Sequence, residues 1–110
     1  MSKNKVFSKT SADRYSLALY ELASEANILA KVEENSFALL TLISSNNDFS
    51  GLIKDPTIKQ GLLIDIITKI STNSKLEVLF KNFLIFLVLK RRFFYIEKIL
   101  KSFSEICSEK

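Results

Sequence analysis

Residues 83–92 read FLIFLVLKRR, a run of apolar side chains followed by three cationic ones. The apolar run is too short to cross a bilayer, which takes about 20 apolar residues. It is also too uniformly apolar for an ordinary surface helix, which keeps one polar face. The stretch therefore predicts a helix that is central to its fold, and it raises the question of what covers the outer side of that helix.

The composition around this stretch favours an all-α domain. The chain has 110 residues, of which 47% are hydrophobic and 25% charged, as in one globular domain. Only two glycines and one proline are present, whereas sandwiches and barrels need many turns. We expect residues 1–10 to form a flexible N-terminal tail and residues 11–110 to form a single helical bundle.

Apolar residues at helical spacing divide this domain into six predicted helices. Pro56 marks the clearest break, because it biases Asp55 away from helical angles. Ser74 and Glu77 have the spacing of a capping box, which predicts that the fifth helix begins near Lys75. The predicted helices cover approximately residues 11–26, 28–44, 48–54, 58–70, 75–90 and 93–108.

The residue types that carry catalysis are scarce. The chain has no histidine, and Cys107 is its only cysteine, so neither a general-base histidine nor a cysteine-rich zinc site is available. Two glycines are too few for a phosphate-binding loop. We expect no catalytic residue, no metal site and no cofactor, and we expect function to lie in a surface.

Two of the predicted helices carry more apolar surface than one core contact requires. The first has Tyr15, Ala18 and Leu22 along one side, and the fifth is apolar almost all round from Val78 to Leu89. If the two helices lie side by side, the surplus residues would line a groove that fits an amphipathic helix of a partner. On composition alone, a tight six-helix bundle in which all these residues belong to the core is at least as good an interpretation.

Three segments, taken in order, resemble the delta subunit of bacterial F-type ATP synthases, whose mitochondrial counterpart is the oligomycin-sensitivity-conferring protein. SADRYSLALYELASEAN (residues 11–27) resembles the opening helix of that family, and LIKDPTI (52–58) resembles its segment after the third helix. NFLIFLVLKRRFFYIEKI (82–99) resembles its fifth-to-sixth helix region, although Lys90 and Arg91 replace the usual Gly or Asn of the turn. The resemblance covers about residues 11–108.

The resemblance implies a six-helix N-terminal domain in the peripheral stalk, the stator of a proton-translocating ATP synthase, with no catalytic role. It places the protein at the cytoplasmic face of the bacterial inner membrane, bound to the complex without inserting in the membrane and without nucleic acid. The family's C-terminal domain, which binds the b-subunit stalk, is expected to be missing from this chain.

The resemblance also implies which partner the surplus apolar surface binds. In the family, the N-terminal helix of an α subunit occupies a groove between the first and fifth helices. The residues expected to line that groove here are Tyr15, Ala18, Leu22, Asn82, Phe86 and Leu89.

Two other functions remain open. The net charge of +4 and the basic turn Lys90–Arg92, with Phe94 or Tyr95 nearby, would suit a helical nucleic-acid-binding module, whose affinity falls steeply with salt. A helix lying on a membrane surface would need a strongly basic face opposite an exposed apolar one. The sixth predicted helix is only mildly basic, so this second alternative ranks lower.

Overall fold

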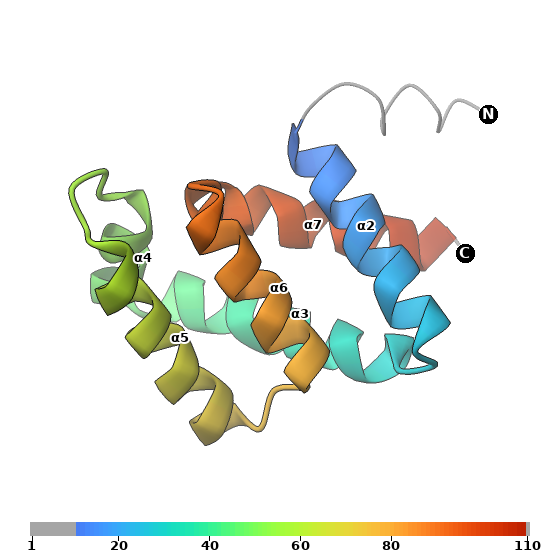
Figure 1. Cartoon of the computed structure of the whole chain (residues 1–110). Helices are drawn as coiled ribbons and strands as arrows, with labels where there is room; N and C mark the ends of the chain where they lie inside the picture. The colour runs from blue at the N-terminus through green and yellow to red at the C-terminus, as the bar shows by residue number, and fades with distance from the viewer. Residues whose placement is uncertain (1–10, 110) are drawn as a thin grey trace.

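The structure is a computed structural model that describes residues 11–109, and the tail predicted for residues 1–10 lies outside the described residues. Within residues 11–109 the chain forms six α-helices, one 3₁₀ turn and no strand, which confirms the all-α helical bundle (Figure 1). The elements are α2 (Ser11–Glu25), α3 (Leu29–Ser45), α4 (Asn47–Lys54), α5 (Gln60–Ser74), α6 (Val78–Leu89), the 3₁₀ turn η1 (Phe93–Tyr95) and α7 (Ile96–Glu109).

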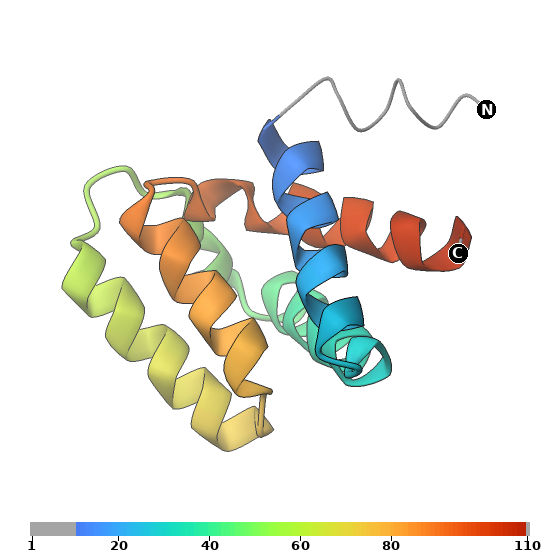
Figure 2. The ribbon, with the colours of Figure 1, turned by 45° about the vertical axis from the view of Figure 1, so that its right-hand side comes forward.

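Two sets of contacts build the bundle, one centred on α7 and one between α5 and α6. Helix α7 packs against α2 and α3, while α5 and α6 form an antiparallel pair (Figures 1 and 2). The core is formed by fully buried side chains from several helices, among them Leu19, Phe80, Ile99 and Phe103. Burial of each such side chain stabilises the fold by about 1.5–3 kcal/mol, and Leu19 of α2 and Phe80 of α6 belong to the same core.

Small residues bring α2 close to α7. Ala12, Ser16 and Ala23 are buried at helical spacing on the α2 face that meets α7. The Ser16 hydroxyl lies 2.9 Å from the Ser102 hydroxyl, which in turn donates to Asp13 Oδ1 at 3.2 Å. These contacts commit one face of α2 to the core, so a neighbouring face remains available for a second contact.

Three helices end at a non-glycine residue with positive φ, namely Asn27 after α2, Lys75 after α5 and Arg91 after α6. After α6, the Arg92 N–H donates to the Leu87 carbonyl at 2.8 Å, a hydrogen bond that closes a helix end and is usually accompanied by glycine. An L-residue in this left-handed conformation costs roughly 1 kcal/mol. The basic turn therefore ends α6 as expected, but with a local energetic cost.

The predicted capping box at Ser74 is wrong. Helix α5 continues through residues 71–74 and ends at Ser74, because the next residue, Lys75, adopts a left-handed conformation with φ 54°. Helix α6 begins only at Val78, and Glu77, its N-cap residue, makes no side-chain cap hydrogen bond. A serine inside the preceding helix is in the wrong place to cap the next one.

A side chain from α3 instead provides the hydrogen-bond acceptor at the start of α6. The Glu77 N–H donates to Asn35 Oδ1 at 2.8 Å, although the two residues are 42 positions apart in the chain. The bond satisfies one of the backbone N–H groups that a helix start leaves without an intrahelical partner. It also ties α3 to the end of α6 that carries Val78.

The break predicted at Asp55–Thr57 is present between α4 and α5. Asp55 Oδ1 accepts from the Thr57 N–H at 2.8 Å and from the Thr57 hydroxyl at 2.6 Å. The hydrogen bonds from the Thr57 hydroxyl and N–H stabilise the carboxylate and so lower the pKa of Asp55. The turn places the start of α5 at Gln60, a little later than the sequence predicts.

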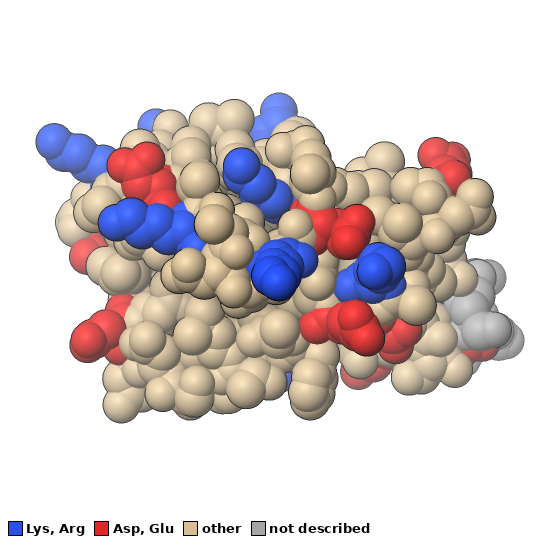
Figure 3. Space-filling view, turned by 90° about the horizontal axis from the view of Figure 1, so that it is seen from below, with Lys and Arg blue, Asp and Glu red and all other residues tan. Residues whose placement is uncertain are grey.

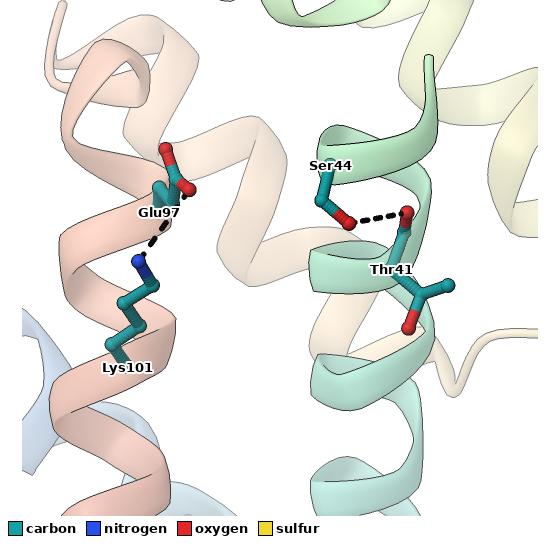
Figure 4. Close-up of polar contacts among 4 residues, drawn as sticks. All are labelled: Thr41, Ser44, Glu97 and Lys101. Atoms are coloured by element: carbon teal, nitrogen blue, oxygen red, sulfur yellow. Dashed lines mark hydrogen bonds and ion pairs between the residues drawn. The ribbon is translucent and has the colours of Figure 1, made fainter.

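The solvent-facing sides of α3 and α7 carry local polar contacts (Figure 4). Lys101 Nζ lies 3.6 Å from Glu97 Oε2, one turn away on α7, and the Ser44 hydroxyl donates to the Thr41 carbonyl at 3.0 Å on α3. Exposed contacts of this kind contribute little to stability. Among residues 11–109, no helix is both long enough and apolar enough to span a bilayer.

Candidate functional site

An apolar groove of about 620 Å³ lies between α2 and α6. The two helices run side by side in opposite directions (Figure 2). We call it the α2–α6 groove. Its lining residues are almost all apolar: Tyr15, Ala18, Leu22, Val78, Leu79, Asn82, Phe83 and Phe86.

Helix α2 contributes one wall through residues spaced by three and four. Tyr15, Ala18 and Leu22 fall on one line along the helix, beside the face that packs on α7. Tyr15 is half-buried, Ala18 is exposed, and Leu22 keeps 47% of its surface accessible. The small side chain of Ala18 leaves the helix backbone open to close approach at the middle of the wall.

Helix α6 contributes the other wall, because it is apolar on both its inner and its outer side. Phe80 and Leu84 face the core, while Val78 and Phe86 remain 70% and 44% exposed on the opposite side. Asn82 lies one turn from each of these two, so the polar side chain interrupts the apolar strip halfway along. The outer side of the apolar run Phe83–Leu89 is therefore partly exposed to solvent in this chain.

The two walls meet at one end of the groove. The rings of Tyr15 and Phe86 make an edge-to-face contact, with centroids 6.2 Å apart and an interplanar angle of 68°. The Lys90 ammonium lies 5.7 Å from the centroid of the Phe86 ring, within the range of a cation–π contact. Phe86 is thus held from two sides although nearly half of it remains accessible to a partner.

The structure brings five of the six predicted groove residues together. Tyr15, Ala18, Leu22, Asn82 and Phe86 all line the α2–α6 groove. Leu89 does not line it: the residue lies one turn beyond Phe86 and is 58% exposed.

The sequence reasoning missed three lining residues, which are Val78, Leu79 and Phe83. Val78 precedes Asn82 and Phe86 at steps of four, and this spacing could have identified it. Leu79 and Phe83 are half-buried and buried at the floor of the groove, so their pattern is that of core residues.

Two smaller hollows lie elsewhere on the described surface. One, of about 340 Å³, lies beside the α4–α5 turn and is lined by Ile53, Leu63, Val88, Phe93, Lys54 and Arg91 among others. The other, of about 350 Å³, lies between α3 and α7, where Glu33 and Glu34 adjoin Phe37 and Leu40. Neither contains the predicted site residues.

The described residues offer little for bond-making chemistry. No group of three or more Cys, Asp and Glu side chains among residues 11–109 is arranged to hold a metal ion. Burial and the nearby negative charge of Glu33 raise the pKa of Cys107 to about 11, so its thiol is protonated at neutral pH. An apolar groove without a reactive pair is suited to binding another helix.

Comparison with known proteins gives concordant matches. The profile of the family described as ATP synthase delta (OSCP) subunit matches residues 12–110. An ATP synthase subunit delta from Pelagibacter ubique is 57% identical over this whole chain, which covers 60% of that relative. The ATP synthase delta subunits from Lactobacillus johnsonii and Mesorhizobium japonicum are 35% and 31% identical over 89% of this chain. The matched part corresponds to 53% of the length of each of these relatives. The chain thus spans little more than half the length of these relatives.

Proposed function

Because this chain belongs to the ATP synthase delta (OSCP) subunit family, we propose that it acts in the peripheral stalk of an F-type, proton-translocating ATP synthase. In this role it is a non-catalytic stator component that helps to hold the catalytic head against the torque of the rotor. The complex would place it peripherally at the cytoplasmic face of the bacterial inner membrane. In the whole protein, a C-terminal domain would contact the b-subunit stalk.

The α2–α6 groove would bind the N-terminal helix of an α subunit. One observation supports this assignment most strongly: five residues that the family resemblance assigns to the partner contact line a single apolar groove. Large apolar side chains that are about half exposed, such as Leu22 and Phe86, are typical of a surface that a partner covers. A helix with apolar residues at i, i+3/i+4 and i+7 would fill it.

The arrangement of the groove also suggests how the energy of binding is distributed. Phe86 and Tyr15 would act as aromatic anchors, since anchors of this type dominate the binding energy of many interfaces. Ala18 would allow the backbone of the incoming helix to approach α2 closely. Asn82 would offer the amide of its side chain to a polar group of the partner in the middle of an otherwise apolar strip.

The alternative of nucleic-acid binding predicts a different surface. The Arg92 guanidinium is directed at the carbonyls of Arg91 and Lys90, at 3.3 and 3.5 Å, so part of the basic turn is engaged within the chain. On the face drawn in Figure 3, the positive and negative side chains are interspersed and separated by wide areas of other residues. A dedicated nucleic-acid binder usually gathers its basic residues on one face.

Calorimetric titration separates the two functions. The probe is a synthetic peptide of the first ~20 residues of the α subunit from the same organism, which as a helix spans about 30 Å. We expect one-to-one binding whose affinity changes little between low and moderate salt. Absence of binding to the folded chain would contradict the proposal, and tight, steeply salt-dependent binding of an oligonucleotide would favour the alternative.

A further inference from the structure

The two ends of the α2–α6 groove differ in charge. Because Tyr15 on α2 contacts Phe86 on α6, the start of α2 lies beside the end of α6. The two helices run in opposite directions, so the end of α2 lies toward the start of α6 (Figures 1 and 2). The groove therefore has a Phe86 end and a Leu22 end, and each can be compared with the charged residues that adjoin it.

The Phe86 end is positively charged. Lys90 follows Phe86 by one helical turn, is exposed, and holds its ammonium 5.7 Å from the centre of the Phe86 ring. Among residues 11–109 no carboxylate lies within ion-pair distance of Lys90.

The Leu22 end is negatively charged on the α2 side. The line of Tyr15, Ala18 and Leu22 continues at the next helical step to Glu25, which is exposed and is the last residue of α2. Glu21, one residue before Leu22, is exposed as well. On the α6 side, Lys90 continues the line of Val78, Asn82 and Phe86 by a further step of four, whereas Lys81 lies one residue off that line and Lys75 precedes the helix.

Given the proposed function on which this rests, we infer that the groove selects the charge order of its occupant as well as its apolar stripe. The bound helix carries acidic side chains at the end of its stripe that meets Lys90. It carries basic side chains at the end that meets Glu25. Charges at the rim of an apolar interface fix register and direction more than they add affinity, because like charges brought together there are unfavourable. Lys90 and Glu25 are thus specificity-determining residues of the groove.

A specificity exchange tests this inference. The first probe is the α-subunit peptide of about 20 residues used above. The second is the same peptide with each Asp or Glu replaced by Lys and each Lys or Arg replaced by Glu. Both are titrated into the wild-type chain and into a chain carrying Lys90→Glu and Glu25→Lys. The control chain carries Lys98→Glu and Glu105→Lys at two exposed positions of α7, a helix that contributes no residue to the groove. All three chains have the same net charge.

The wild-type and control chains should prefer the native peptide by about threefold to tenfold, the range expected for one or two rim charge pairs. The Lys90→Glu and Glu25→Lys chain should prefer the charge-exchanged peptide. If both peptides bind but the preference does not change with the double reversal, the inferred charge order is wrong while the groove assignment stands. If the native peptide does not bind to the folded wild-type chain, the proposed function fails and the inference with it.

Discussion

Tyr15 of α2 and Phe86 of α6 meet edge to face, with ring centroids 6.2 Å apart, and they close one end of an apolar groove. The two residues are 71 positions apart in the chain (86 − 15) and belong to different helices. Phe86 is nevertheless 44% exposed, so the contact does not bury it. The packing of the chain on itself leaves this aromatic pair available for a second, external contact.

Replacing Phe86 by Ala should weaken binding of the α-subunit peptide by more than about 1 kcal/mol, because a partly exposed aromatic anchor is lost. Calorimetry measures the effect on affinity, and thermal unfolding shows whether the variant remains folded. Phe37→Ala is the matched control, since Phe37 is 73% exposed on α3 and lies outside the α2–α6 groove. Equal affinities for the wild type and Phe86→Ala would exclude Phe86 as an anchor.

Replacing Ala18 by Asp should abolish peptide binding and leave the fold intact. Ala18 is exposed, so the carboxylate remains solvated in the free chain but is desolvated without a partner when a helix covers it. Ala38→Asp, on the exposed side of α3, introduces the same charge elsewhere. Loss of the helical circular-dichroism signal in Ala18→Asp, but not in Ala38→Asp, would mean that Ala18 belongs to the core.

Replacing Asn35 by Ala should lower the free energy of unfolding by about 1 kcal/mol, the usual cost of removing a helix cap. The reason is that the Glu77 N–H loses its acceptor at 2.8 Å and with it the link from α3 to the start of α6. Urea unfolding measures the change. Asn73→Ala, at an exposed position of α5, should change the unfolding free energy much less. If Asn35→Ala and Asn73→Ala lower the unfolding free energy by the same amount, Asn35 does not cap α6.

Replacing Arg91 by Gly should raise the unfolding free energy by up to about 1 kcal/mol, because Gly adopts positive φ without the steric cost of a side chain. Arg91 has φ 60°, whereas its neighbour Arg92 has φ −120°. Arg92→Gly therefore removes the same charge without relieving strain and should not stabilise the chain. Thermal unfolding of both variants measures the two changes in stability. A chain destabilised by Arg91→Gly would contradict the strain assigned to Arg91.

Cys107 should react slowly with iodoacetamide at pH 8 in the folded chain and faster in urea. Burial, with a smaller contribution from Glu33, raises the pKa of its thiol from 9.0 to about 11, and only the thiolate reacts readily. Because the folded state favours the neutral thiol, the contribution of Cys107 to the free energy of unfolding is fully present below pH 9. It is lost as the pH rises through 9 toward 11. Equal alkylation rates with and without urea would show that Cys107 is not protected.

The fold was predictable from the sequence where a single segment contained the whole signal. The apolar run from Phe83 to Leu89 indicated a helix that is apolar on more than one side, and the low glycine and proline content indicated helices. Pro56 marked the break between α4 and α5, because a proline acts on the residue directly before it. These features depend on local backbone sterics and periodicity, which a sequence displays directly.

Features that depend on distant contacts could not be predicted in this way. The capping box at Ser74 was a reasonable local pattern, but α5 continues to Ser74 and ends there because Lys75 is left-handed, and Asn35 supplies the acceptor for Glu77. Two of the three groove residues that were missed, Leu79 and Phe83, were missed for a related reason, since they line the floor of the groove from the border of the core. Only the packed structure distinguishes a core residue from one at the edge of a groove.

The most direct test of the central claim is to map the contact surface of the α-subunit peptide by amide chemical-shift changes in the ¹⁵N-labelled chain. We predict the largest changes on α2 near Ala18 and Leu22 and on α6 near Asn82 and Phe86, with small changes on α3 near Phe37 and on α4. Changes concentrated at the α4–α5 turn or between α3 and α7, with α2 and α6 unaffected, would contradict the assignment of the α2–α6 groove as the binding site.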